Sequence, residues 1–238
     1  MRGVNLTLIL CGVLAHALPA KGEVISKTRT ISGMKVEYRV VLPAQYNPTQ
    51  PYPGIIAFLG GGQEARMLDN EIKRVWRDQA EKRGYIVVLP AAPDGQLFFE
   101  GGKRVFPEFL KVLLSDYKIL DDKFHIAGHS NGGLSAFEIA ASWPQYFWSI
   151  TGFPGFLMDA TPARVKGISK MCIYMFAGEL DPGWTEEMNT QAKLFRSNGM
   201  VVQTAVEKGQ PHLLATLGGE GASRLFDQFE QARKGCSK

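Results

Sequence analysis

From residue 24 onward, short runs of β-branched and apolar residues alternate with longer segments whose apolar residues recur at helical spacing. The short runs predict strands and the longer segments predict helices. Strands that alternate with helices are joined by crossover connections, which produce a mostly parallel sheet with helices on both faces. The expected strands are residues 24–30, 34–42, 54–59, 85–89, 123–127, 148–152, 171–176 and 201–207, and the expected helices are residues 65–83, 107–117, 132–142, 185–197 and 221–234.

The first two expected strands are joined by a turn at Ser32-Gly33. This hairpin can add antiparallel strands at one edge of the otherwise parallel sheet. No repeat, low-complexity tract or linker interrupts the alternating pattern that follows. We therefore expect residues 21–238 to form a single α/β domain.

The composition excludes several other classes of protein. The chain has 238 residues, of which 45% are hydrophobic and 21% charged; it is too apolar for a disordered chain and has no collagen-like or heptad repeat. Its 27 Lys and Arg against 23 Asp and Glu give a net charge of +4, which is scattered along the chain. Because no basic run resembles a nucleic-acid footprint, we expect no nucleic-acid partner.

The first twenty residues differ in composition from the rest. Arg2 is their only charged residue, the stretch from Val4 to Leu18 is largely apolar, and small residues follow at its end. These features are typical of a secretory signal peptide. A membrane anchor or a buried helix is the alternative, although the stretch falls short of the roughly 20 apolar residues that a stable span needs. We expect residues 1–20 to be removed and the mature chain to be secreted or periplasmic, without stable membrane insertion.

In a parallel sheet, functional side chains collect beyond the carboxyl ends of the strands. After the strand expected to end at Ala127, the sequence reads Gly128-His129-Ser130-Asn131-Gly132 and continues into a helix. This G-x-S-x-G pattern predicts a sharp turn that exposes the Ser130 hydroxyl, with glycines where the strand and the helix approach too closely for a Cβ atom. Ser130 is the candidate nucleophile. The alternative is a glycine-rich turn whose serine only caps the helix.

A serine hydroxyl needs a base to remove its proton, and the sequence contains only four histidines. His16 lies in the expected signal peptide, and His125 lies inside a strand. His129 adjoins Ser130 in the tight turn, where consecutive side chains diverge. His212 remains, in a loop just past the last expected strand, and we predict that it is the base.

The base in turn needs a carboxylate that holds its tautomer and stabilises the imidazolium. Asp181 follows the strand expected at residues 171–176 and is the candidate, while Glu179 is a competitor that sits closer to the strand end. The chain order Ser130, Asp181, His212 distinguishes this arrangement from other serine-triad folds. A solvated loop position for Asp181 and a surface position for His212 are the alternatives.

Acyl transfer also needs hydrogen-bond donors for the oxyanion that forms. The backbone N–H of Asn131, directly after the serine, is one candidate. The loop after the strand at residues 54–59, Gly60-Gly61-Gly62, can supply another because glycines let N–H groups approach a substrate closely. A phosphate-binding loop is the other glycine-rich possibility, but the Lys-Ser/Thr pair of a P-loop and the GxGxxG pattern are both absent from the sequence.

The serine turn, the glycine loop, the Gly-x-x-Asp segment and the late histidine together resemble the α/β-hydrolase superfamily over about residues 34–234. Within it, residues 119–124 (ILDDKF) running into residues 128–133 (GHSNGG) are similar to secreted esterases of the polyhydroxybutyrate-depolymerase and feruloyl-esterase-like branch. The resemblance implies the α/β-hydrolase fold and places the second oxyanion donor in the glycine loop, where Gly61 and Gly62 are our candidates. The family usually has His-Gly after its third strand, whereas Leu59 is followed here by three glycines.

These residues predict a serine hydrolase that cleaves carboxylic esters through an acyl-enzyme, and they imply no cofactor and no metal. An exopeptidase or a thioesterase would use the same residues, and a catalytically silent ligand-binding protein is a further alternative. Too little chain lies between Gly152 and Met171 for a large cap domain, so we expect an open site that accepts small or polymer-end esters. Four aromatic residues near the strand ends either line a substrate pocket or pack under loops, and these are Phe98, Phe99, Phe153 and Trp184.

Once the expected signal peptide is removed, the chain keeps two of its three cysteines, Cys172 and Cys236. Two remaining thiols in an oxidising compartment favour one disulfide. The alternative is that Cys172 is a small buried residue of a strand and Cys236 a residue of the chain end.

Overall fold

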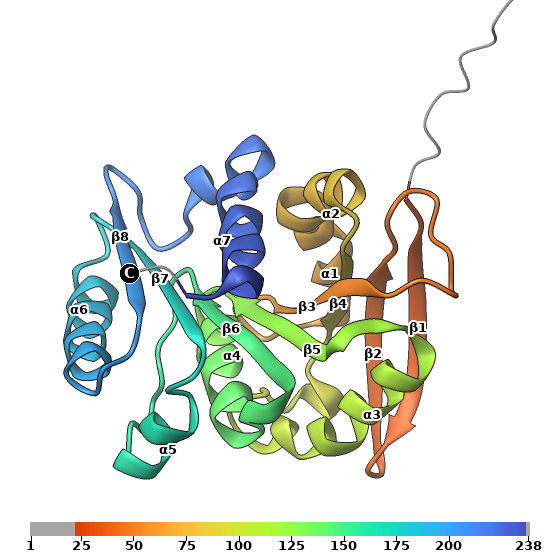
Figure 1. Ribbon diagram of the computed structural model, residues 1–238, viewed down its shortest axis with the longest axis horizontal. Coiled ribbons are helices and arrows are strands. Elements are labelled where there is room, and N and C mark those ends of the chain that lie inside the picture. Colours follow the sequence, from red (N-terminus) through yellow and green to blue (C-terminus); the bar gives the residue numbers. More distant parts are fainter. Residues whose placement is uncertain (1–21, 237–238) are drawn as a thin grey trace, which may run out of the picture.

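The computed structural model describes residues 22–236, and within them eight strands form one sheet in the order β1-β2-β4-β3-β5-β6-β7-β8 (Figure 1). β2 pairs antiparallel with both of its neighbours, and every other neighbouring pair is parallel. The predicted α/β class, with a mostly parallel sheet and an antiparallel hairpin at one edge, is confirmed. The strands are β1 (Val24–Ile31), β2 (Met34–Val41), β3 (Tyr52–Phe58), β4 (Ile86–Pro90), β5 (Ile119–Gly128), β6 (Phe147–Gly152), β7 (Cys172–Gly178) and β8 (Val202–Glu207).

Helices cover both faces of the sheet (Figure 1). They are α1 (Leu68–Glu71), α2 (Arg77–Arg83), α3 (Phe106–Asp116), α4 (Asn131–Ser142), α5 (Pro162–Gly167), α6 (Pro182–Ser197) and α7 (Ser223–Lys234). The apolar residues of α3, α4, α5 and α6 belong to one buried cluster, and those of α1, α2 and α7 belong to another. Each cluster fills the space between one face of the sheet and its helices, so the core has two layers.

The central strands contribute side chains to both layers. In β4, Ile86 and Val88 lie in the first cluster, whereas Val87 and Leu89 lie in the second. Successive side chains of a strand point to opposite faces, so a strand covered on both sides needs apolar residues at every position. This is why the central strands are continuous apolar runs in the sequence.

The segment expected as one helix at residues 65–83 is divided in the structure. A 3₁₀ turn, Ala65–Met67 (η1), precedes α1, and a π-helical turn, Ile72–Trp76 (η2), separates α1 from α2. Leu68, Ile72 and Trp76 are buried, as their spacing predicts. The apolar spacing indicates which side of the segment is buried, but it carries no signal for the change in backbone hydrogen bonding.

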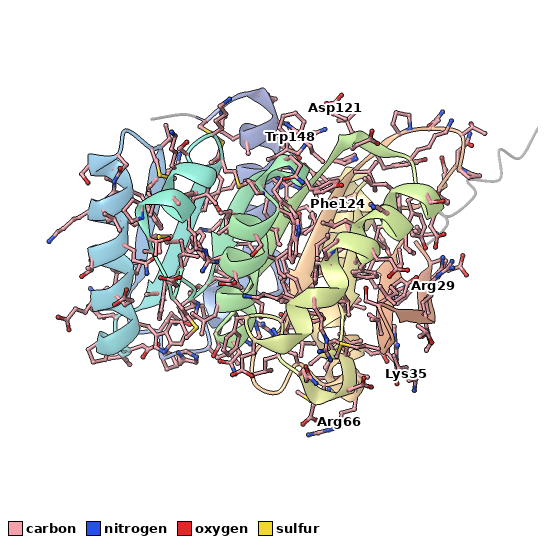
Figure 2. All side chains as sticks on the ribbon, turned by 90° about the horizontal axis from the view of Figure 1, so that it is seen from below. Arg29, Lys35, Arg66, Asp121, Phe124 and Trp148 are labelled. Atoms are coloured by element: carbon pink, nitrogen blue, oxygen red, sulfur yellow. A yellow bond between two sulfur atoms is a disulfide. The ribbon has the colours of Figure 1, made fainter. Side chains whose placement is uncertain are left out.

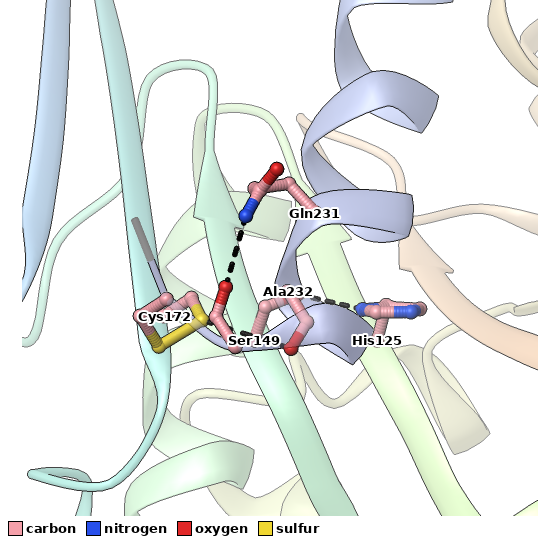
Figure 3. Close-up of a disulfide and its surroundings, with 7 residues drawn as sticks. His125, Ser149, Cys172, Gln231 and Ala232 are labelled. Carbon is pink, nitrogen blue, oxygen red and sulfur yellow. Dashed lines mark hydrogen bonds between the residues drawn. A yellow bond between two sulfur atoms is a disulfide. The ribbon is translucent and has the colours of Figure 1, made fainter. Parts of the chain in front are cut away.

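A disulfide joins Cys172, the first residue of β7, to Cys236, which lies just past α7 (Figure 3). The two Cα atoms are 5.2 Å apart. Under the same end of α7, the ring of His125 on β5 lies 4.9 Å from that of Phe229 on α7, and its Nδ1 lies 2.8 Å from Ser149 Oγ on β6. The disulfide thus ties the end of α7 to β7, and Phe229 packs α7 on β5.

Some of the sequence-based expectations concern parts of the chain beyond the described residues. The expected signal peptide, residues 1–20, lies outside them, and so does part of the single domain expected at residues 21–238. Both expectations stay predictions. Among residues 22–236, no helix combines the length and the apolar character that crossing a membrane requires.

Candidate active site

Ser130 lies in a sharp turn between the end of β5 and the start of α4. Its backbone has φ 55° and ψ −126°, which a residue with a side chain rarely adopts, and its N–H donates to the Pro154 carbonyl at 2.8 Å. A Cβ atom on Gly128 would lie 2.3 Å from the Gly132 carbonyl oxygen, and one on Gly132 would lie 2.4 Å from the Phe58 carbonyl oxygen. Only glycine fits either position, and the close approach of strand and helix leaves the serine side chain projecting beyond the sheet.

The structure brings Ser130, His212 and Asp181 together at the carboxyl edge of the sheet. Ser130 follows β5, Asp181 lies between β7 and α6, and His212 lies in the loop after β8. His212 Nε2 is 2.8 Å from Ser130 Oγ, and His212 Nδ1 is 2.6 Å from Asp181 Oδ2. A carboxylate only accepts hydrogen bonds, so Nδ1 carries the imidazole proton and Nε2 can accept the proton of the serine hydroxyl.

The loop that carries His212 is attached to the end of β7. The N–H of Leu180 donates to the Gln210 carbonyl at 2.9 Å, and a Cβ atom on Gly178 would lie 2.3 Å from that same oxygen. Glu179, the competing carboxylate, accepts from the Gly209 N–H at 2.8 Å. Glu179 therefore holds the turn that precedes His212, while Asp181 contacts the imidazole.

The glycine loop lies beside the serine turn. The side-chain amide of Asn131 donates to the Gly61 carbonyl at 2.9 Å, and the N–H of Gln63 donates to the Gly60 carbonyl at 3.2 Å. Gly61 has φ +59°, a conformation that favours glycine. Within residues 22–236, the N–H groups of Gly61, Gly62 and Asn131 form no backbone hydrogen bond in loops or turns, and Asn131 is the first residue of its helix. These three N–H groups remain available to a substrate oxygen.

A buried ionic group that the sequence analysis did not identify lies under the glycine loop. His129 turns away from Ser130, and its Nδ1 is 3.6 Å from a Glu71 carboxylate oxygen. Arg74 donates to both oxygens of Glu71, at 2.8 and 3.0 Å. Burial by itself raises the pKa of Glu71, but the interactions with His129 and Arg74 outweigh burial and hold that pKa below its usual value. The only feature of the sequence that could have indicated this ionic group is the spacing of Glu71 and Arg74, which stand three residues apart.

The ring of His129 also restricts the glycine loop. A Cβ atom on Gly60 would lie 2.7 Å from His129 Nε2. A side chain at position 60 therefore cannot be added without moving the ring or the loop. This contact is a physical reason for glycine directly after Leu59.

A cavity of about 520 Å³ opens beside this loop. Its walls include Gly60–Gly62, His129, Met67 and Arg74, and also Leu213, which follows the candidate base in the sequence. Arg66, at its rim, lies at the opposite edge of the molecule from Asp121 and Trp148 (Figure 2). The cavity is thus at the same edge of the sheet as Ser130.

The four aromatic residues expected near the site have different positions. Phe98 is fully buried against Phe58 and Phe106, with ring centroids 5.1 and 5.4 Å apart, which matches packing under a loop, one of the two alternatives given for it. Its N–H donates to Gln63 Oε1 at 3.1 Å, and this bond draws the loop into the core. Phe153 is also buried, which matches the same alternative.

The two remaining aromatic residues are partly exposed. Phe99 is half-buried and is absent from the walls of the cavity beside the glycine loop. Trp184 is half-buried, and its ring centroid lies 5.0 Å from that of His212 and 5.0 Å from that of Phe156. Of the four aromatic residues, only Trp184 therefore contacts the candidate base. Among the described residues, no group of three or more His, Cys, Asp or Glu side chains is arranged to hold a metal ion.

Comparisons with known proteins identify the fold. No family model and no curated protein sequence matches the chain. Among solved structures, a thermostable esterase is 19% identical with a TM-score of 0.67, and the match covers 89% of this chain and 61% of that one. A ferulic acid esterase is 17% identical with a TM-score of 0.68, over 91% of this chain and 99% of that one. An S-formylglutathione hydrolase from Agrobacterium tumefaciens is 15% identical with a TM-score of 0.65, over 93% and 97% of the two chains.

These similarities extend over most of the chain, although it spans less than two thirds of the thermostable esterase. At such low identity they establish a shared fold, which is the α/β-hydrolase fold predicted from the serine turn and the order of the site residues. The segment between β6 and β7 contains the six-residue helix α5 and no large cap.

Proposed function

We propose that this chain is a serine hydrolase that cleaves carboxylic esters through an acyl-enzyme. The observation that carries the proposal is the unbroken line of hydrogen bonds from Asp181 through His212 to Ser130, on a strained turn that exposes the serine. A serine hydroxyl is a weak nucleophile unless a correctly placed base accepts its proton. The similarity of the fold to known esterases supports the same reaction class.

In the first half-reaction, His212 Nε2 takes the proton of Ser130 as Oγ attacks the carbonyl carbon of the ester. The electrons of the carbonyl π bond move to its oxygen and form an oxyanion, which we expect the N–H groups of Asn131, Gly61 and Gly62 to stabilise. The tetrahedral intermediate then collapses, the bond to the alkoxy oxygen breaks, and the imidazolium of His212 gives its proton to the departing alcohol. Asp181 keeps the imidazole oriented and stabilises its positive form throughout.

In the second half-reaction, water replaces the alcohol. His212 removes one proton from water while the oxygen attacks the acyl-serine carbonyl, and the same N–H groups stabilise the second oxyanion. Collapse of this intermediate breaks the bond to Ser130 Oγ, which takes the proton back from His212. The side chain of His212 is 40% exposed and that of Asp181 17% exposed, so the imidazole is accessible to substrate and water while its carboxylate partner is more shielded.

We also propose that the mature protein acts outside the cytoplasm. The apolar segment at residues 1–20 supports export. The disulfide between Cys172 and Cys236 supports an oxidising compartment, because structural disulfides are rare where thiols are kept reduced. Secretion into the medium or the periplasm agrees with both observations.

Covalent labelling combined with hydrolysis tests the proposed reaction. A fluorophosphonate should label Ser130, and the protein should hydrolyse p-nitrophenyl acetate faster than an aminoacyl p-nitroanilide. Ser130→Ala should abolish labelling and lower kcat by on the order of 10⁶. Ser142→Ala, which removes a hydroxyl bonded to the Glu138 carbonyl at the end of α4, is the matched control and should retain both properties. A protein that neither reacts with the label nor depends on Ser130 would refute the proposal.

A further inference from the structure

The cavity beside the glycine loop is placed to hold part of the substrate of the proposed reaction. Its walls include Gly60–Gly62, two of which are proposed oxyanion donors, and Leu213, which follows the proposed base. The cavity therefore borders both the proposed oxyanion site and the loop of the proposed base. Its volume of about 520 Å³ lies within the range of roughly 300–1,000 Å³ that is typical of small-molecule sites.

Two side chains of the cavity wall are apolar and solvent-exposed. Met67 is 44% exposed and Leu213 is 48% exposed, and they are two of the six large hydrophobic residues that are exposed among the described residues. Exposed apolar area that gathers at a concave site is a signature of ligand binding, whereas isolated exposed hydrophobic residues are ordinary. A ligand that covers these two side chains removes apolar surface from water.

The charged groups of the cavity wall are already paired with one another. Arg74 is held by both oxygens of Glu71, whose side chain is only 8% exposed. At the rim, Arg66 pairs with Glu64. Each of the two arginines lies beside a glutamate, so these four side chains give the wall no net charge that would attract a carboxylate or an ammonium group.

We propose that this cavity is the specificity site for an uncharged, apolar substituent of the ester, which contacts Met67 and Leu213. The proposal rests on the function proposed above and adds the chemical class of the substrate. The substituent belongs either to the acyl group or to the alcohol, because both flank the reacting carbonyl. Charged esters are disfavoured, since a charged group in the cavity would lose hydration without gaining a partner.

Shortening the side chains of Met67 and Leu213, one at a time, tests the proposal. The kcat/KM ratio of p-nitrophenyl butyrate to p-nitrophenyl acetate reports on the acyl side, and the ratio of benzyl acetate to ethyl acetate reports on the alcohol side. Met67→Ala and Leu213→Ala should each lower one of these ratios about tenfold, because loss of a few methyl and methylene contacts in a pocket costs about that much. Leu194→Ala on α6 removes an equivalent, 37% exposed side chain elsewhere and should change neither ratio.

Introducing an unpaired charge into the cavity wall tests the proposal that charged esters are disfavoured there. Leu213→Arg should raise kcat/KM for p-nitrophenyl hemisuccinate relative to p-nitrophenyl butyrate by about tenfold or more, whereas Leu194→Arg should leave this preference unchanged. The proposal is overturned if the neutral-ester ratios of both truncation variants equal those of the wild type, or if the wild type already prefers the hemisuccinate.

A binding measurement separates failure of this proposal from failure of the proposed reaction. In Ser130→Ala protein labelled with ¹³C-methyl methionine, the Met67 resonance is assigned by its loss in a Met67→Leu variant. Benzyl acetate and ethyl butyrate should shift that resonance, and monoethyl succinate should not. If fluorophosphonate labelling fails while the resonance shifts, the reaction is wrong and the cavity assignment holds. If labelling succeeds and no neutral ester shifts the resonance, the cavity assignment is wrong.

Discussion

The three histidines within the described residues differ in what their rings can reach. His125 is fully buried in the sheet, and His129 points under the glycine loop toward Glu71. His212 alone contacts Ser130, at 2.8 Å. An imidazole can move a proton during the reaction only from a position within hydrogen-bond reach of the reacting oxygen. Elimination along the sequence leads to the same residue because strand interiors and tight turns restrict where a side chain can point.

Asp181→Asn tests the role of the carboxylate. Asparagine keeps the shape of the side chain but loses the negative charge, so His212 loses the partner that fixes its tautomer. We expect kcat for p-nitrophenyl acetate to fall about 10³- to 10⁴-fold with an unchanged unfolding midpoint. Glu179→Gln is the control, because Glu179 contacts the Gly209 N–H instead of the imidazole. Equal losses in the two variants would contradict the assignment.

Gly60→Ala tests whether the contact with His129 holds the glycine loop in place. The added Cβ atom would lie 2.7 Å from His129 Nε2, so we expect the loop to shift and the proposed oxyanion donors with it. Loss of one such donor costs about 10²- to 10³-fold in kcat, which is the decrease we expect from steady-state kinetics. Gly183→Ala meets no atom within 4 Å and should keep full activity. Full activity of Gly60→Ala would show that the loop tolerates the displacement.

At the scale of elements, the strands were more predictable from the sequence than the loops. Buried strands such as β4 and β7 are continuous apolar runs, and such runs are visible in a sequence because both faces of the strand are covered. The place of Phe98 was not predictable in the same way. It depends on a hydrogen bond to the side chain of Gln63, which is 35 residues away, and no local pattern encodes that contact.

In the candidate site, too, some features were predictable from the local sequence and others depended on contacts between distant segments. The G-x-S-x-G turn was predictable because the contact between β5 and α4 requires glycine at positions 128 and 132. Both glycines belong to the motif itself, so the requirement is visible in a short stretch of sequence. Glu71 and His129, in contrast, meet only because the segment after β3 folds back over the serine turn. A π-helical turn follows Glu71 directly, and nothing in the spacing of its apolar residues predicts it.

The attachment of α7 to β7 leads to a prediction about stability. The disulfide closes a segment of 64 residues, for which the chain-entropy model gives about 4 kcal/mol. The double variant Cys172→Ala/Cys236→Ala should therefore lose about 2–4 kcal/mol in the free energy of unfolding, measured with urea. Reduced wild-type protein should match it, and both should hydrolyse p-nitrophenyl acetate at the normal rate below the transition. Equal stability of the oxidised and reduced forms would show that the cross-link adds nothing.

At the scale of the whole molecule, burial of His125 couples folding to pH. Burial and, secondly, the charge of Arg233 lower the pKa of His125 from 6.5 to about 3. Its Nδ1 pairs with Ser149 Oγ, and its Nε2 has no hydrogen-bond partner within residues 22–236. The folded protein therefore keeps this imidazole neutral in a range of pH in which the unfolded chain binds a proton.

The difference in proton binding by His125 between the folded and the unfolded chain determines how the stability changes with pH. Between pH 6.5 and pH 3 the unfolded chain binds more protons at this position, so the free energy of unfolding rises with pH and decreases on acidification. Each pKa unit corresponds to about 1.4 kcal/mol, so His125 should remove about 2–3 kcal/mol of stability between pH 6.5 and pH 4.5. Glu138 and Glu207 have pKa values below 4.5, and their contribution is lost mainly at lower pH.

A pair of variants isolates this contribution. In His125→Phe/Ser149→Ala, both partners of the buried hydrogen bond become apolar, so no polar group is left unpaired and the ring can still pack on Phe229. Its free energy of unfolding, measured with urea at several pH values, should fall about 2–3 kcal/mol less than that of the wild type between pH 6.5 and pH 4.5. Ser149→Ala alone keeps the imidazole and should keep the full acid sensitivity. If all three proteins lose the same free energy over this range, His125 titrates alike in the folded and unfolded chains, and the acid sensitivity arises elsewhere.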